Sequence, residues 1–194
     1  MRIIGGRLRG MKLAELGAGD QQAHLRPTSD RVREAMFNLL INSIGLELDG
    51  IRVLDLFAGT GALGLEALSR GAARIAFVDD GAKSRALLRE NIEKARAMGS
   101  TDVWRRDATR LGPNRSAGYG LIFMDPPYGK ALGEAALRSA EEGNWLADDA
   151  VIVWEESNPP EQPAGFRLLD QRRYGDTLVT VMRHEKGALA PPLA

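Results

Sequence analysis

From Ile51 onward, the chain alternates short, mostly apolar runs with longer amphipathic segments. The apolar runs are typical of strands that are buried on both faces, and the segments between them repeat apolar residues at helical spacing. This alternation predicts an α/β fold with a mostly parallel sheet and helices on both of its faces. The strand-like runs are 51–57, 74–79, 102–107, 120–125 and 150–156, and the helical segments are 62–71, 82–98 and 133–143.

The two ends of the chain add smaller elements to this pattern. Two strand-like runs flank Tyr174-Gly175-Asp176, a good turn sequence, so a C-terminal antiparallel hairpin completes a predicted seven-stranded sheet. Residues 1–16 contain short apolar pieces broken by three glycines and predict a small β-hairpin that carries arginines. Residues 26–45 predict a helix that Thr28 or Ser29 can cap and that Gly45 can end.

Composition excludes several classes of protein. The chain has 194 residues, enough for one domain with a sizeable core. It contains no cysteine and two isolated histidines, which predicts that it binds no metal. No apolar run is long enough to span a membrane, and the N-terminus lacks the apolar stretch of a signal peptide. We therefore expect a cytoplasmic protein that binds neither metal nor membrane.

Charge is balanced over the whole chain but is distributed unevenly. Basic and acidic residues each number 26, so the formal net charge is zero. Residues 1–33 hold seven basic side chains against three acidic ones, whereas residues 134–161 hold eight acidic side chains against the single Arg138. The N-terminal region is therefore either a surface for a negatively charged partner or an ordinary solvated surface with uneven charge.

A glycine-rich turn follows the first strand of the predicted parallel sheet. Gly59, Gly61 and Gly64 fit the spacing G-x-G-x-x-G, and Asp79 ends the next strand twenty residues beyond Gly59. Such glycines let the backbone approach a ligand, and an acid at this distance can accept hydrogen bonds from ribose hydroxyls. The pattern predicts a nucleoside-containing cofactor, which is either a dinucleotide or S-adenosylmethionine.

Five blocks of the sequence together resemble one known family. They are "MRIIGGRLRG", "RPTSDRVREAMFNLL", "DLFAGTGALGLEALSRGA", "DPPY" and the late "YGDT". The combination resembles the RsmD family, bacterial class I methyltransferases that methylate guanine N2 of 16S ribosomal RNA. The resemblance runs from Met1 to about Arg183. It implies a class I methyltransferase fold, S-adenosylmethionine as the cofactor, and 16S rRNA or an assembling small ribosomal subunit as the partner of a monomeric enzyme.

The same resemblance implies roles for individual residues. Asp55, Phe57, Gly59 and Gly61 would surround the amino-acid end of the cofactor, Asp79 would bind its ribose, and Asp107 would lie near its adenine. The family usually has Glu where Asp79 stands, and the shorter side chain keeps the acceptor. Arg26 and Thr28 match a motif near the active site, which makes them candidate RNA contacts together with Arg7 and Arg9 of the hairpin. Residues 1–45 would thus contact RNA, residues 51–184 would form the catalytic core of a single 194-residue domain, and residues 187–194 would be a disordered tail.

The Asp125-Pro126-Pro127-Tyr128 sequence also has a chemical interpretation that does not depend on the family resemblance. The exocyclic amine of a base is a poor nucleophile because its lone pair is delocalised into the ring. Acceptors for the amine hydrogens, namely the Asp125 carboxylate and the Pro126 carbonyl, favour a geometry that frees the lone pair. The prolines fix the direction of these acceptors because their φ is locked, and the Tyr128 ring can stack on the base.

Trp104 and Trp154 lie within strand-like runs, which favours core packing for both.

Three other functions remain as alternatives. A DNA adenine-N6 methyltransferase shares the DPPY sequence, but such enzymes usually carry an extra DNA-reading segment for which this chain has little room. An NAD(P)-binding oxidoreductase would use the glycine turn and leave DPPY unexplained. A catalytically silent RNA-binding factor would have no need of Asp125 and Tyr128.

Overall fold

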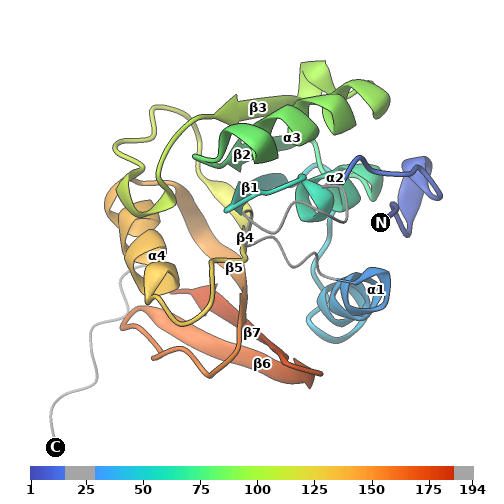
Figure 1. Cartoon of the computed structure of the whole chain (residues 1–194). Coiled ribbons are helices and arrows are strands. Elements are labelled where there is room, and N and C mark those ends of the chain that lie inside the picture. The colour runs from blue at the N-terminus through green and yellow to red at the C-terminus, as the bar shows by residue number, and fades with distance from the viewer. Residues whose placement is uncertain (16–28, 186–194) are drawn as a thin grey trace, which may run out of the picture.

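The computed structural model describes residues 1–15 and 29–185, and a seven-stranded sheet passes through its centre (Figure 1). The strand order is β3-β2-β1-β4-β5-β7-β6, in which the strands from β3 to β5 run parallel and β7 is antiparallel to both neighbours. This confirms the predicted mostly parallel sheet with a C-terminal antiparallel hairpin. The strands are β1 (Arg52–Leu56), β2 (Arg74–Val78), β3 (Thr101–Trp104), β4 (Tyr119–Met124), β5 (Leu146–Glu156), β6 (Phe166–Tyr174) and β7 (Thr177–His184).

Helices cover both faces of this sheet (Figure 1). One face carries α1, α2 and α3, and the other carries α4. Within the described ranges, no helix combines the length and the apolar character needed to cross a membrane. The helices are α1 (Asp30–Asn38), α2 (Ala62–Ser69), α3 (Ala82–Lys94) and α4 (Leu132–Glu142), with a π-helical turn η2 (Leu39–Ser43) and 3-10 turns η1 (Gly6–Leu8), η3 (Met98–Ser100) and η4 (Ala108–Arg110).

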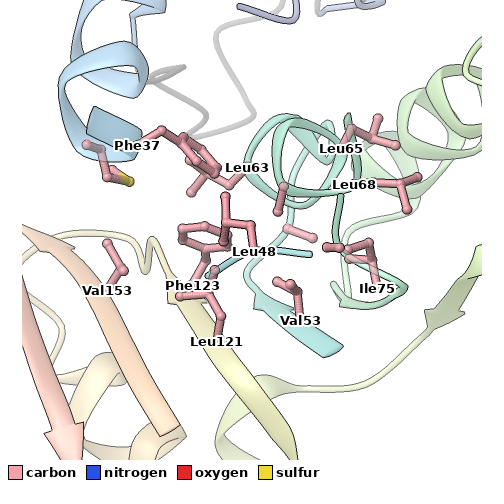
Figure 2. Packing of buried hydrophobic residues seen from close by; sticks show 14 of the residues in the cluster. Phe37, Leu48, Val53, Leu63, Leu65, Leu68, Ile75, Leu121, Phe123 and Val153 are labelled. Atoms are coloured by element: carbon pink, nitrogen blue, oxygen red, sulfur yellow. The ribbon is translucent and has the colours of Figure 1, made fainter. Parts of the chain in front are cut away.

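The sheet is buried on both faces because the side chains of a strand point alternately to opposite sides. Along β4, Leu121 and Phe123 belong to the core beneath α1, α2 and α3, whereas Ile122 and Met124 belong to the core beneath α4. Figure 2 shows the first core, in which the Phe37 ring of α1 lies 5.6 Å from the Phe123 ring. Burial on both sides accounts for the continuous apolar runs from which the strands were predicted.

Helix α1 begins and ends close to the predicted positions. The Ser29 hydroxyl accepts a hydrogen bond from the Val32 N–H (3.3 Å), so Ser29 is the cap, and the other predicted cap, Thr28, lies outside the described residues. The helix continues through η2, after which Gly45 adopts a φ of 73°. A glycine takes this left-handed conformation at little cost and so ends the helix.

Within residues 1–15, three backbone hydrogen bonds of 2.8–3.1 Å join the two arms of the predicted N-terminal hairpin. Arg2 and Lys12 form an isolated antiparallel bridge, and the tip of the hairpin is the turn η1. At Gly6 a Cβ atom would lie 1.8 Å from the Ser69 carbonyl oxygen. Strand pairing and close packing on α2 therefore both shape this segment.

Buried Glu66 of α2 anchors the same segment. Its carboxylate oxygens accept hydrogen bonds from the backbone N–H groups of Ile4 (2.7 Å) and Gly5 (2.8 Å), and it also accepts one from Arg70 (2.7 Å). Glu66 is 0% exposed, and a buried carboxylate is costly unless its lone pairs are filled. The N-terminal segment and the Glu66 carboxylate therefore stabilise each other.

We expect Glu66→Ala to lower the free energy of unfolding by about 2–5 kcal/mol, because two backbone N–H groups lose their acceptor and Arg70 loses its partner. Urea denaturation measures this loss, and hydrogen exchange should show faster exchange at residues 4 and 5. Glu93→Ala, at an exposed position of α3, is the matched control and should change stability by less than about 0.5 kcal/mol. Unchanged protection of residues 4 and 5 would contradict the anchoring role.

Candidate functional site

The carboxyl ends of β1, β2 and β4 open into a cavity of about 1130 Å³. In open α/β sheets, ligands bind at this edge. Pockets for one small ligand typically measure roughly 300–1,000 Å³, so this cavity can hold a nucleoside-sized cofactor beside a second planar group. Eight of the residues predicted to be catalytic or cofactor-binding line it: Asp55, Phe57, Gly59, Asp79, Asp125, Pro126, Pro127 and Tyr128.

The strand register brings the two acids at the neighbouring strand ends to the same level. Val78 of β2 and Met124 of β4 both lie opposite Leu56 of β1. Asp79 and Asp125 are the residues that directly follow these two strands, so they lie on either side of the chain as it leaves β1. The cavity therefore has an acid on each side of the glycine turn.

The glycine turn itself is shaped by close packing and by Asp55. Gly61 adopts a φ of 78° at the start of α2, and a Cβ atom at Gly64 would lie 2.4 Å from the Phe77 ring. The buried Asp55 carboxylate accepts a hydrogen bond from the Gly64 N–H (2.9 Å). Phe57 has a φ of 60°, a left-handed conformation that costs free energy for any residue other than glycine. Asp55 thus holds the start of α2 in place and leaves the turn open to the cavity.

Burial raises the pKa of Asp55 well above its usual value, and the charges of Asp125 and Asp79 add to this effect. The hydrogen bond from Gly64 acts in the opposite direction and favours the ionised form. Desolvation is the larger of the two effects. The floor of the cavity therefore tolerates negative charge only at a cost, which a positively charged ligand would reduce.

Asp79 connects the glycine turn to the start of α3. One carboxylate oxygen accepts the Gly59 N–H (2.8 Å) and the other accepts the Gly81 N–H (2.8 Å). Burial raises its pKa, while these two hydrogen bonds lower it. Each carboxylate oxygen can accept more than one hydrogen bond, so Asp79 keeps the capacity to bind the hydroxyl groups of a ribose.

The glycine turn and Asp79 form one wall of the cavity, and the Asp125–Tyr128 loop forms another. Burial and the charge of Glu156 raise the pKa of Asp125 to about 7. The Tyr128 hydroxyl hydrogen-bonds the Thr177 hydroxyl at the start of β7 (3.2 Å), and burial raises the pKa of Tyr128 to about 12. Tyr128 is therefore a neutral side chain, and the Thr177 contact fixes its orientation.

Several predicted site residues lie away from the cavity wall. β3 ends at Trp104, before Asp107, whose exposed carboxylate accepts hydrogen bonds from the Thr109 N–H (2.8 Å) and hydroxyl (2.7 Å). These bonds lower the pKa of Asp107. Within the described ranges, neither Asp107 nor Gly61 is part of the cavity lining, and the roles assigned to them stay predictions.

The predicted RNA contacts are placed only in part. Arg7 and Arg9 are exposed at the tip of the N-terminal segment and are not among the described residues that line the cavity. Arg26 and Thr28 lie outside the described residues. Trp154 is 0% exposed, as predicted, whereas the prediction of core packing for Trp104 was wrong, because its side chain lies at an edge strand and is 37% exposed.

Several residues at the cavity were not predicted from the sequence. Arg33, Lys130, Ser157 and Asp176 line it, and Glu156 lies next to Asp125. The predicted fifth strand ends in two acids, so the rule that selected Asp79 and Asp125 at strand ends would also have selected Glu156. Asp176 belongs to the YGDT block, which was interpreted as a turn and as part of the family resemblance but not as part of the site. Among the described residues, no group of three His, Cys, Asp or Glu side chains is arranged to hold a metal.

Comparisons with known proteins show which family this chain resembles. The family model described as "Conserved hypothetical protein 95" matches residues 1–183. The ribosomal RNA small subunit methyltransferase D of Escherichia coli K12 is 37% identical over 189 residues, which cover 95% of this chain and 90% of that protein. The protein of the same name from Haemophilus influenzae is 33% identical over 180 residues and is covered to 89%, against 90% of this chain.

Solved structures show the same likeness in three dimensions. The Escherichia coli protein yhhF, described as a methyltransferase, superposes with a TM-score of 0.79 at 34% identity, and the match covers 95% of this chain and 98% of that chain. A hypothetical protein from Thermus thermophilus superposes with a TM-score of 0.70 at 26% identity, covering 93% and 98%. A match of the family model over nearly the whole chain, together with these relatives, shows that this chain belongs to the RsmD family and has the class I methyltransferase fold.

Proposed function

We propose that this protein transfers a methyl group from S-adenosylmethionine to the exocyclic N2 amine of a guanine in 16S ribosomal RNA. The observation that carries the proposal is the cavity shared by the glycine turn, Asp79 and the Asp125–Tyr128 loop. A nucleoside site and an amine-binding loop at one cavity are what this reaction needs. The names of the Escherichia coli and Haemophilus influenzae relatives support ribosomal RNA as the substrate.

The cofactor would lie against the ends of β1 and β2. Asp79 would accept hydrogen bonds from its ribose, and the backbone of Phe57 and Gly59 would approach its amino-acid end, with Asp55 holding the turn. S-adenosylmethionine supplies an electrophilic methyl group on a positively charged sulfonium. The buried acids Asp55, Asp79 and Asp125 suit that charge, because a nearby positive charge favours their ionised forms.

The substrate amine would lie against Asp125. Hydrogen bonds from the amine to the Asp125 carboxylate and the Pro126 carbonyl favour a geometry in which the nitrogen lone pair is free to attack. The same acceptors stabilise the positive charge that develops on the nitrogen. Pro126 and Pro127 fix the path of the backbone at this point, so the acceptors are oriented before the base arrives.

Tyr128 would hold the plane of the base. Its ring lines the cavity and its hydroxyl is bound to Thr177, so the ring offers a fixed flat surface for stacking. The pKa of about 12 makes its hydroxyl a poor proton acceptor at neutral pH. The ring, and not ionisation of the hydroxyl, would therefore carry its role.

Arg7 and Arg9 would contact the RNA backbone from the N-terminal segment. Both are exposed, and Glu66 fixes the segment that carries them to α2. Guanidinium groups suit phosphate oxygens geometrically and by charge. Arg26 and Thr28 stay proposed RNA contacts on the strength of the family motif alone. The RNA partner would be 16S rRNA, either free or within an assembling small subunit.

The activity is tested by incubating the protein with S-adenosylmethionine and 16S rRNA or small subunits from cells that lack this gene. Mass spectrometry of the nucleosides should show N2-methylguanosine. N6-methyladenosine on a DNA substrate would instead support the alternative adenine methyltransferase, and binding of NAD(P) without binding of S-adenosylmethionine would support an oxidoreductase.

Asp125→Ala and Asp79→Ala should separate the two halves of the site. We expect Asp125→Ala to slow single-turnover methylation by about 10²- to 10³-fold, because one preorganised acceptor is lost, and to leave cofactor affinity within about threefold of wild type. Asp79→Ala should instead weaken S-adenosylmethionine binding, measured by calorimetry, more than it weakens RNA binding. A near-normal single-turnover rate for Asp125→Ala would contradict the assigned chemistry.

Tyr128→Phe and Tyr128→Ala should differ in effect. The Phe variant keeps the stacking ring and loses only the bond to Thr177, which orients the ring, so kcat/KM should stay within about tenfold of wild type. The Ala variant also loses stacking, about 1–3 kcal/mol, and should fall a further 5- to 150-fold. Thr177→Val is the matched control and should reproduce the effect of Phe. Equal losses for Phe and Ala would show that the hydroxyl, and not the ring, is required.

Replacing both Arg7 and Arg9 with alanine should weaken RNA binding and reduce its salt dependence. Each phosphate contact releases counterions, so loss of two contacts should lower the slope of log affinity against log salt by about 1.4–1.8. Filter binding over a salt series, with S-adenosylhomocysteine present, gives this slope. An unchanged slope would show that the N-terminal segment does not contact the RNA backbone.

A further inference from the structure

Glu156 ends β5 beside the loop that carries Asp125 and Tyr128. Its Oε1 atom accepts hydrogen bonds from the Ser157 N–H (2.9 Å) and from the N–H of Gly129, the residue after Tyr128 (3.3 Å). The second bond joins β5 to the tip of the loop across 27 residues of sequence. Glu156 therefore attaches that tip to the central sheet.

A second attachment comes from the neighbouring strand. The Tyr128 hydroxyl contacts Thr177 at the start of β7, and in the β5–β7 ladder Glu156 lies opposite Leu178, the next residue. The loop is thus held at two adjacent points, by Glu156 at the end of β5 and by Thr177 at the start of β7. The loop contains two prolines and is bound at Tyr128 and Gly129. Its tip therefore has little freedom to move relative to Asp125 at its start.

Glu156 also contributes charge. It is the neighbour whose negative charge adds to burial in raising the pKa of Asp125, and it acts in the same direction on Tyr128. Other charged or titratable groups surround Asp125 or line the cavity with it: Asp55 on β1, Asp79 and Asp80 after β2, Lys83 on α3, Tyr128 in the loop, Lys130 just after it, Glu155 on β5, Asp176 in the β6–β7 turn, Arg33 on α1 and the N-terminal residue Met1.

We propose that Glu156 is a positioning residue for methyl transfer, which holds the tip of the Asp125–Tyr128 loop and keeps a second negative charge beside Asp125. The inference rests on the proposed function and deepens it, because it assigns the control of the reacting carboxylate to a residue outside the DPPY sequence. Glu156 acts through Asp125 and the loop, and not by contact with the base.

The charge has a chemical use at the end of the reaction. The N2 lone pair forms a bond to the methyl carbon, the carbon–sulfur bond breaks, and its electron pair remains on sulfur. The positive charge is then on N2, and one N2 proton passes to the Asp125 carboxylate, which leaves a neutral methylated guanine and a neutral carboxylic acid. A like charge at Glu156 favours this protonated form of Asp125.

Two substitutions separate the attachment from the charge. Glu156→Gln keeps an oxygen that can accept the Gly129 and Ser157 N–H groups but removes the charge, so it should lower the pKa of Asp125. Ionised Asp125 is needed to accept the amine, so kcat/KM for RNA falls as pH drops through the pKa of Asp125 in the free enzyme. For Glu156→Gln, the midpoint of this fall should move to lower pH by roughly one unit, with a plateau within about tenfold of wild type.

Glu156→Ala removes both the attachment and the charge, and should lower kcat by about 10- to 100-fold at every pH, since a loosened loop misplaces the reacting group. Affinity for S-adenosylmethionine, measured by calorimetry, should stay within about twofold in both variants, and their melting temperatures report on folding. Glu161→Gln, at an exposed position beyond β5, is the control and should match wild type. A wild-type pH profile for Glu156→Gln, or a wild-type kcat for Glu156→Ala, would overturn the proposal.

Nucleoside analysis of the wild-type product separates this failure from failure of the proposed function. If the wild-type enzyme methylates a different amine, the proposed substrate is wrong, but the pH shift of Glu156→Gln still decides the role of Glu156. If it makes N2-methylguanosine and the variants are indistinguishable from wild type, the function stands and Glu156 has no part in it.

Discussion

The register of three parallel strands is the constraint on which the rest of this site depends. Val78 and Met124 both pair with Leu56 of β1. The residues that follow them, Asp79 and Asp125, therefore lie at the same edge of the sheet, on the two sides of the chain that leaves β1. A shift of one residue in either pairing would turn the acid and its whole strand to the opposite face of the sheet. The apolar side chains that alternate between the two cores fix this register, so the core of the protein determines the geometry of the cavity.

The acids in the cavity are kept in place by different means. Asp55 and Asp79 accept backbone N–H groups of the glycine turn and of the start of α3, and these bonds offset part of the cost of their burial. Asp125 lies where burial and Glu156 both oppose ionisation. Two of the acids are thus bonded to the glycine turn and to the start of α3, whereas the third lies where burial and a like charge favour its protonated form. Such a division of roles among similar carboxylates follows from their surroundings alone.

Parts of the chain that lie outside the parallel sheet support the two walls of the cavity. Glu66 attaches the N-terminal segment to α2, the helix that follows the glycine turn. Thr177 of the C-terminal hairpin, together with Glu156 at the end of β5, holds the Asp125–Tyr128 loop. The segment with the exposed Arg7 and Arg9 is therefore joined to the helix that follows the glycine turn. The family model matches residues 1–183, a range that includes the residues of these attachments.

The sequence by itself determined the sheet, its mixed strand directions and the acids at the strand ends, because two-sided burial produces apolar runs and parallel strands place their ends at one edge. It also identified the glycine turn and the DPPY loop, since both depend on local backbone chemistry. Only the tertiary structure decided that Asp107 lies outside the cavity lining, that Trp104 is exposed at an edge strand, and that Glu156 and Thr177 hold the Asp125–Tyr128 loop. These facts depend on where β3 ends and on which strand pairs with β5. The end of β3 and the pairing of β5 are set by contacts between residues far apart in the chain. A local pattern of residues does not predict such contacts.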